Sequence, residues 1–300
     1  MINGVLNIYK EKGYTSHDVV AKLRGIVGQK KIGHTGTLDP DAVGVLPVCL
    51  GKATKLCDML TDKNKTYETV MLLGKVTDTQ DISGATLSEQ DVSTLDENAV
   101  RAAVMSFLGD YMQIPPMYSA LKVNGKKLYE LAREGIEIER KARPVQILEI
   151  QIKEINLPRV RMEVTCSKGT YIRTLCHDIG AKLGCGSCME ELIRTKVSRF
   201  DIKDSLKLDQ VANLKNADQL DAHLVAIDEM FSDYEAVMLK EEFMSLVYNG
   251  NVFFPRHLQK SIELTDEKMV RVYDVNGDFI AIYRFIKDKN LFKIVKMFKA

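Results

Sequence analysis

The sequence predicts an α/β (α+β) fold, in which helices flank a mixed, largely antiparallel sheet and a small β-rich domain follows. Residues 19–27 and 171–183 carry apolar side chains at helical spacing. Residues 145–152 and 160–166 instead alternate apolar and polar side chains, as half-buried strands do. The third observation is an Asn-Gly pair at residues 276–277 between two β-rich runs, a strong short-range signal for a hairpin.

In the first half of the chain, predicted helices and strands alternate. Ser16 is predicted as the N-cap of the first helix and Gly28 as its end. Residues 67–73 are rich in β-formers and predict a strand. The polar residues 77–93 predict a loop, and Thr-Leu-Asp-Glu at residues 94–97 predicts a capping box that opens a second helix.

In the second half, the two alternating segments predict an antiparallel pair that turns near residues 156–158, and the helix after them closes at Gly184. Polar helical sequence then replaces strands around residues 205–232. We therefore predict two domains, residues 1–232 and 233–300. In the second domain, the Asn-Gly pair predicts a type I′ turn with a positive φ at both residues.

Composition indicates an ordinary globular protein: of 300 residues, 45% are hydrophobic and 28% are charged. With neither a signal-peptide pattern nor a long apolar run, we expect a cytoplasmic protein that does not enter membranes. The net charge is only +1, but residues 284–300 carry six Lys or Arg against one Asp, and residues 61–114 carry four basic against nine acidic residues. A basic end suits contact with a phosphate backbone, although a solvated charged end explains it equally well.

The six cysteines do not form a metal-binding pattern. Only Cys185 and Cys188 are close in sequence, whereas zinc sites usually combine two such pairs or add histidines. We therefore expect free thiols in a reducing compartment, and no metal. The sequence has neither a phosphate-binding loop nor a dinucleotide fingerprint, so we expect no cofactor of the nucleotide type.

The most informative segment is Gly-His-Thr-Gly-Thr-Leu-Asp-Pro at residues 33–40. Pro40 confines Asp39 to extended or turn conformations, and the glycines allow another molecule to approach the backbone closely. An Asp before proline most often only stabilises a turn. At neutral pH, however, Asp39 is ionised, and it is also a candidate nucleophile or base.

Five further residues are of interest, and most of them have both an ordinary and a functional interpretation. Tyr67 is either a packed strand tyrosine or a ring on which a nucleobase stacks. Arg173 is either a surface arginine or the partner of a buried carboxylate, and Lys168 near the same helix start could bind a phosphate. His34 could insert between bases, move a proton or hydrogen-bond within its loop, and Leu192 is by default core.

Taken together, these residues resemble the TruB family of tRNA pseudouridine synthases. The similarity runs in order through most of the first 200 residues, in the segments 10–24, 33–55, 65–68, 77–81, 113–122, 128–135, 140–144 and 166–175. It implies a sheet of pseudouridine synthase type and the isomerisation of uridine 55 in the tRNA T-loop, by base flipping and without a cofactor. The last domain is more loosely similar to the PUA-like RNA-binding domain.

The resemblance also implies a role for each candidate residue. Asp39 would be the catalytic aspartate, paired with Arg173. Tyr67 would stack on the flipped uracil, Leu192 would line its pocket, and His34 would fill the space that the base leaves. The expected partner is the T-arm of tRNA, and the expected state is a monomer without metal.

Three residues depart from the family pattern: Glu11 replaces proline, Val43 a small hydroxyl residue and Arg199 glycine. None of them removes a proposed catalytic group. Other hypotheses are a tRNA-binding or folding factor, a guide-RNA-dependent relative, and a glycoside hydrolase that uses Asp39 with Asp41. The intact candidate set favours an enzyme over a pure binding factor, and the absence of long basic extensions favours a stand-alone enzyme over a guide-RNA-dependent one.

Overall fold

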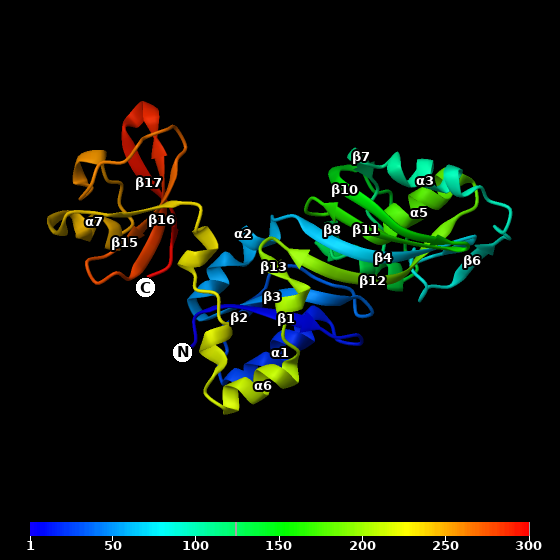
Figure 1. Ribbon diagram of the computed structural model, residues 1–300, viewed down its shortest axis with the longest axis horizontal. Helices are drawn as coiled ribbons and strands as arrows, with labels where there is room; N and C mark the ends of the chain where they lie inside the picture. Colours follow the sequence, from blue (N-terminus) through cyan, green and yellow to red (C-terminus); the bar gives the residue numbers. More distant parts are fainter. Residues whose placement is uncertain (124, 300) are drawn as a thin grey trace.

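The computed structural model describes residues 1–123 and 125–299, so Ala300, the last residue of the predicted second domain, lies outside the described residues. A long twisted sheet with flanking helices forms the larger part of the molecule. A smaller sheet, orange and red in Figure 1, lies beyond one end of it. None of the described helices is long and apolar enough to cross a membrane.

Nine strands of the described residues form the large sheet, in the order β1-β3-β12-β4-β11-β10-β7, with β2 paired to β3 and β13 paired to β12. Neighbouring strands are antiparallel except β3 and β12, which run parallel. The predicted mixed, largely antiparallel sheet is therefore confirmed. The strands are β1 (Gly4–Lys10), β2 (Ile32–His34), β3 (Val43–Leu50), β4 (Lys65–Leu73), β7 (Gly109–Gln113), β10 (Arg143–Asn156), β11 (Arg159–Cys166), β12 (Ser187–Val197) and β13 (Phe200–Asp201).

Two pairs of helices cover opposite ends of this sheet. At one end, α1 (Ser16–Val27) and α6 (Leu208–Asn216) bury their apolar faces against β1 and β3. At the other end, α3 (Glu97–Met105) and α5 (Ile172–Leu183) pack on β4, β10 and β11. The sheet between these two cores is where the loop with Asp39 lies.

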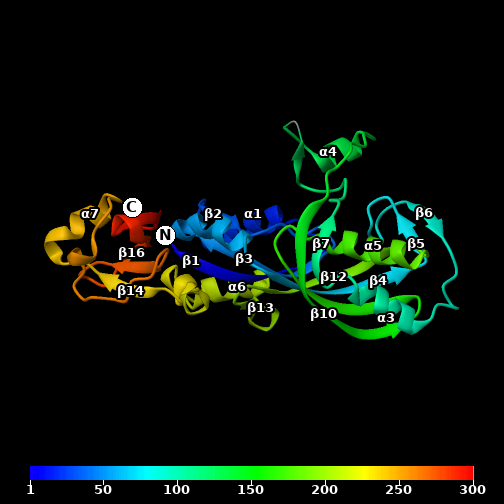
Figure 2. The ribbon, with the colours of Figure 1, turned by 90° about the horizontal axis from the view of Figure 1, so that it is seen from above.

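Smaller elements lie outside the large sheet. One hairpin joins β5 (Lys75–Thr77) to β6 (Thr86–Glu89), and another joins β8 (Lys122–Val123) to β9 (Lys126–Lys127). The second hairpin and α4 (Leu128–Arg133) stand away from the body in Figure 2. After β3 the chain forms the 3₁₀ helix η1 (Gly51–Leu56) and then α2 (Cys57–Thr61).

The C-terminal part has a sheet and a core of its own. Its strands β14 (Glu235–Met238), β15 (Met269–Tyr273), β16 (Phe279–Ile286) and β17 (Leu291–Met297) pair in sequence order, and α7 (Met244–Tyr248) packs on them. A separate apolar cluster joins this sheet to the large one, with Phe298 and Ile282 on one side and Val45 and Cys49 on the other. The β-rich character is as expected, while the division after residue 232 stays a prediction.

The helix ends predicted at Gly28 and Gly184 are confirmed, whereas both predicted N-caps are wrong by one or two residues. Thr15, not Ser16, caps α1: its backbone is extended, its hydroxyl accepts from the Asp18 amide at 3.0 Å, and the Asp18 carboxylate accepts from the Thr15 amide at 2.8 Å. Ser16 is 1% exposed and its side chain points inward, so it cannot reach that amide. For α3 the cap is Asp96 in place of the capping box at residues 94–97, because its carboxylate accepts from the Asn98 amide.

The structure differs from the prediction in one loop and in one turn. The predicted loop at residues 77–93 contains β6, which pairs with β5 across a turn that the Asp78 carboxylate closes by accepting from the Ala85 amide at 2.8 Å. The predicted type I′ turn is also wrong, since Gly277 has a positive φ and Asn276 does not. The buried carboxylate of Asp274 accepts from the Asn276 and Asp278 amides at 3.0 and 2.9 Å, which stabilises a longer turn.

Candidate active site

The loop that carries Asp39 joins β2 to β3 and is held by hydrogen bonds on both sides of the aspartate. The Leu38 amide donates to the Ser16 hydroxyl at 2.9 Å, which explains why Ser16 turns inward from α1. The Ala42 amide donates to the Asp39 carbonyl at 3.1 Å, closing a turn around Pro40. The side chain of Asp39 remains 41% exposed, so a substrate can reach it.

Lys10 binds the part of this loop that follows Asp39. It is fully buried on β1, and its ammonium donates to the carbonyls of Pro40 at 3.0 Å and Ala42 at 2.6 Å. Burial lowers the pKa of Lys10 to about 8. Nothing in the local sequence indicates this role of Lys10, because the contact spans 30 to 32 residues and a lysine is normally at the surface.

Replacing Lys10 by Met is expected to lower the free energy of unfolding by about 1–3 kcal/mol, because the buried Ala42 carbonyl loses its donor. If Asp39 is the reacting group, the change should also slow the reaction by about tenfold or more, since a small displacement of a reacting group is costly. Urea denaturation and single-turnover rates measure the two effects. Lys12→Met, at an exposed neighbouring position, is the matched control. An unchanged rate and stability would remove Lys10 from the site.

A second buried cation, Arg194 of β12, supports the other end of the loop. Its Nε donates to the Val45 carbonyl at 2.7 Å and its Nη2 to the Gly36 carbonyl at 3.4 Å. The parallel pairing of β3 with β12 is so close that a Cβ at Gly44 would lie 2.3 Å from the Arg194 carbonyl oxygen, and Gly44 has a φ of +106°. Glycine is therefore required at residue 44 for two reasons.

The structure brings Arg173 directly to Asp39. One guanidinium nitrogen, Nη2, lies 3.0 Å from Asp39 Oδ2 and also donates to the Tyr118 carbonyl at 2.8 Å. The other, Nη1, lies 3.3 Å from Asp81 Oδ2. Only 7% of the Arg173 side chain is exposed, so the guanidinium is held in one orientation between two carboxylates.

Asp81 is a further site residue, beside Lys10 and Arg194, that sequence reasoning missed. It lies in the loop between β5 and β6, where its Oδ1 accepts from the Thr79 hydroxyl at 2.9 Å and the Ser83 amide at 3.0 Å. These bonds fix the carboxylate that faces Arg173. The signal that could have found it is the resemblance itself, which includes residues 77–81, but the polar composition there indicated only a loop.

Opposing charges set the acidity of Asp39. Burial raises the pKa of Asp39 above its usual range, the Arg173 guanidinium opposes the shift, and the Asp81 carboxylate adds to it. A carboxylate with a raised pKa is a better proton acceptor than a free one. The arrangement therefore provides a base or nucleophile whose ionised form is stabilised by the neighbouring Arg173 guanidinium.

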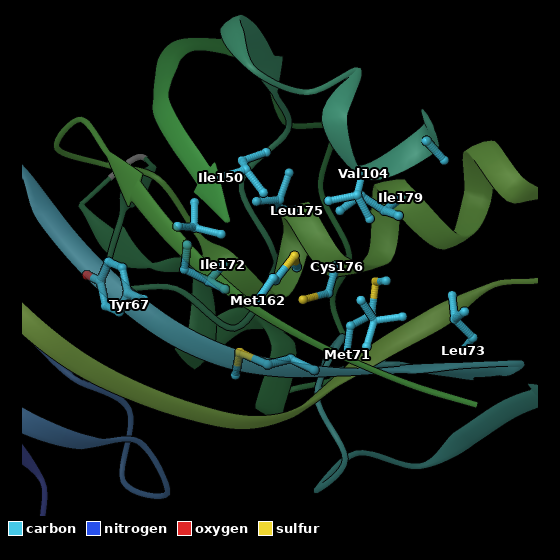
Figure 3. Close-up of a cluster of buried hydrophobic side chains, with 14 of the residues drawn as sticks. Tyr67, Met71, Leu73, Val104, Ile150, Met162, Ile172, Leu175, Cys176 and Ile179 are labelled. Carbon is cyan, nitrogen blue, oxygen red and sulfur yellow. The ribbon is translucent and has the colours of Figure 1, made fainter. Parts of the chain in front are cut away.

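Apolar side chains form a surface beside this pair. Tyr67 on β4 is 9% exposed and shares a cluster with Leu38 and Ala42 from the Asp39 loop, and Leu192 of β12 packs against it. Figure 3 shows Tyr67 at one end of the cluster, with Met71 and others of its members further along β4. Burial raises the pKa of the Tyr67 hydroxyl, which therefore stays neutral. Flat and aliphatic walls of this kind suit a planar, uncharged ring.

His34 lies at the end of β2, five residues before Asp39. It is half-buried, and its Nδ1 accepts from the Gly36 amide at 3.4 Å. Burial lowers the pKa of His34, so its imidazole is neutral at pH 7. A neutral ring here can occupy an apolar gap more easily than a charged one.

The remaining residues that the sequence singled out make contacts within the chain. Val43 opens β3 opposite Ile193. Arg199 is exposed and donates to the Glu229 carbonyl at 2.7 Å. Lys168 is exposed and forms an ion pair with Asp62 at 2.9 Å, so its contact with a phosphate stays a prediction.

Solved structures share this fold over almost the whole chain. One is a Cbf5–Nop10–Gar1 complex, with a TM-score of 0.74 and 26% identity, covering 99% of this chain and 85% of that one. Another is an H/ACA RNP bound to a substrate RNA containing 2′-deoxyuridine, with a TM-score of 0.74, 24% identity and the same coverage. The second likeness, at this identity, concerns the fold alone.

Two family models match consecutive parts of the chain. The N-terminal domain of the TruB family pseudouridylate synthases matches residues 24–172, and the C-terminal domain of tRNA pseudouridylate synthase B matches residues 173–233. Fold and site together therefore define a pseudouridine synthase. Curated relatives narrow the assignment: tRNA pseudouridine synthase B of Lachnoclostridium phytofermentans is 50% identical, over 99% of this chain and 100% of that protein. The protein of the same name from Clostridium novyi is 46% identical, over 94% and 95%. The chain belongs to the TruB family.

Proposed function

We propose that this protein converts uridine 55 in the T-loop of tRNA to pseudouridine, with Asp39 as the catalytic carboxylate. The observation that carries the proposal is the Asp39–Arg173 pair beside the apolar wall of Tyr67 and Leu192. The relatives' name, tRNA pseudouridine synthase B, supports tRNA as the substrate. An isomerase of the TruB family needs such a carboxylate next to a base-binding surface.

The chemistry is an intramolecular rearrangement. The glycosidic bond from C1′ to uracil N1 breaks, a bond from C1′ to C5 forms, the C5 proton leaves and N1 gains a proton. Asp39 can attack the sugar, attack the base, or remove a sugar proton to give a glycal; each route requires the ionised carboxylate that Arg173 maintains. Tyr67 would stack on the ring and Leu192 would exclude water from it.

The target base must leave its stack before it reaches Asp39, at a cost of a few kcal/mol. His34 would enter the T-loop and fill the space left behind, which suits its neutral, half-buried ring. The base would enter the apolar surface beside Asp39, because that carboxylate is the exposed member of the ion pair.

A cluster of lysines supports contact with the tRNA backbone. Lys31, Lys52 and Lys296 lie close enough to Lys55 that they, together with burial, lower its pKa, and Lys55 donates to the Met297 carbonyl at 2.9 Å. The cluster joins the large sheet to the basic β17 region. We propose that the second domain, residues 233–300, is a PUA-like module that adds to tRNA binding, and that the protein acts as a monomer.

The experiment is to incubate the purified chain with an unmodified tRNA transcript and map pseudouridine by carbodiimide modification and primer extension. We expect one new stop, at uridine 55. A transcript with cytidine at that position should show no stop. Tight binding of tRNA without any stop would instead favour the binding or folding factor, and stops elsewhere would disprove the position.

A further inference from the structure

Two of the cysteines, Cys49 and Cys57, have their side chains in contact. Cys49 of β3 is paired with Gly33 of β2, and paired residues of an antiparallel ladder project their side chains to the same face. A Cβ at Gly33 would lie 3.0 Å from the sulfur of Cys57. The Cys57 sulfur therefore fills the space beside Cys49 that the missing Gly33 side chain leaves. Both cysteines belong to one apolar cluster, and the two thiols are close enough to shift each other's pKa.

The pair is asymmetric. Cys57 is partly exposed at the start of α2, whereas Cys49 is fully buried. The partner thiol is the main cause that lowers the pKa of Cys57 and raises that of Cys49. An accessible thiol with a lowered pKa is the form that oxidants attack.

The other cysteines lack this combination. Burial raises the pKa of Cys166 and of Cys188 to about 11 and that of Cys176 to about 12, and all three are at most 1% exposed. Cys185 is 6% exposed, and burial raises its pKa too. These four thiols provide an internal standard for any oxidation of the pair.

We propose that Cys57 and Cys49 are an oxidisable dithiol, in which a hydroperoxide oxidises Cys57 and Cys49 then closes a reversible disulfide. The Cys57 thiolate attacks the peroxide, the O–O bond breaks, and Cys57 becomes a sulfenic acid while the leaving hydroxide takes the thiol proton to form water. Cys49 then attacks the Cys57 sulfur and displaces hydroxide, which takes the Cys49 proton to form a second water. Two thiols lose two electrons and one hydrogen peroxide gains them.

The disulfide between Cys49 and Cys57 would have two consequences. It prevents further, irreversible oxidation of Cys57 to a sulfinic acid. It also ties α2 to β3 next to Gly33, whose chain neighbour is His34, and it closes a loop that contains Lys52 and Lys55. The loop between the two cysteines thus contains two lysines of the cluster that the proposed function assigns to tRNA, although the oxidation of the dithiol does not depend on that function.

Peptide mapping of the folded, full-length chain tests the proposal. After brief treatment with a few equivalents of hydrogen peroxide and alkylation, trypsin should release residues 32–52 joined to residues 56–63, about 2 Da lighter than the sum of the two reduced peptides. Dithiothreitol should restore both. Sulfinic acid at Cys57 without the joined peptide, or a link between other cysteines, would overturn it.

Two variants test the order of events, with circular dichroism to confirm that each is folded. Cys49→Ser should accumulate a sulfenic acid at Cys57 that dimedone traps, and Cys57→Ser should give no adduct at Cys49. Cys185→Ser should behave as the unaltered chain does. An adduct at Cys49 in the Cys57→Ser variant would reverse the assigned roles and contradict the proposal.

Discussion

Asp39→Asn is expected to reduce pseudouridine formation by a factor of at least about 10³, while the Kd for tRNA changes by less than about threefold. Asparagine has nearly the same shape but cannot ionise, so it can neither accept a proton nor act as a nucleophile. The backbone turn to Ala42 and the contact of Arg173 with Asp81 do not involve the altered group, so the loop should keep its form. Single-turnover kinetics and filter binding with the same transcript measure the two quantities.

Asp41→Asn is the matched control, because Asp41 is exposed two residues further on. Its activity should stay within about twofold of the unaltered chain, which also tests the glycoside hydrolase hypothesis, since that mechanism needs both carboxylates. Turnover retained in the Asp39→Asn variant would exclude Asp39 as the catalytic group. A tRNA-folding assay with the same variant would show whether a folding role coexists with catalysis.

Arg173→Met should have the second largest effect, a loss of about 10²–10³ in kcat, since it leaves two carboxylates facing each other without a cation. The pH profile gives the more specific test. Asp39 acts as its ionised form, so activity falls as the pH drops through its raised pKa. Arg173 opposes that rise; without it the acid limb of kcat/KM should move to higher pH.

Asp81→Asn removes a carboxylate that raises the pKa of Asp39, so it should move the same limb to lower pH. Opposite displacements by two variants at one ion-pair network are not expected from a general loss of structure. Arg159→Met is the control: it breaks an exposed arginine pair with Glu190, at 2.8 and 2.9 Å, which solvent screens and whose loss should leave the profile unchanged. Equal profiles for all variants would contradict the assignment.

Much of the local structure could be predicted because its signals are local. The helix that ends at Gly184 and the antiparallel pair β10–β11 follow from periodicity and a glycine with a φ of +73°. The errors arise where a side chain has a distant use. Serine is a common helix cap, but the Ser16 hydroxyl accepts a hydrogen bond from the Leu38 amide instead. Asn-Gly favours a type I′ turn, but the Asn276 amide donates to the buried Asp274 carboxylate and a longer turn forms.

The candidate site divides in the same way. Asp39 could be found from its own neighbours, since proline, glycines and an ionisable group in one loop are a local pattern. The distant residues that hold this loop and its ion pair in place could not be predicted in this way. Lys10, Arg194 and Asp81 reach their contacts across 30 to 158 residues, and nothing in their local sequence distinguishes a charged side chain with such a contact from one that solvent surrounds.

The sequence by itself therefore determined the fold class, most helices and strands, the family and the carboxylate at residue 39. Only the tertiary structure decided how that carboxylate is held. The parallel contact of β3 with β12 places Arg194 under the loop, and α5 delivers Arg173 between Asp39 and Asp81. Charge and burial act through distance in space, and the pKa of Asp39 exists only once the chain has brought these groups together.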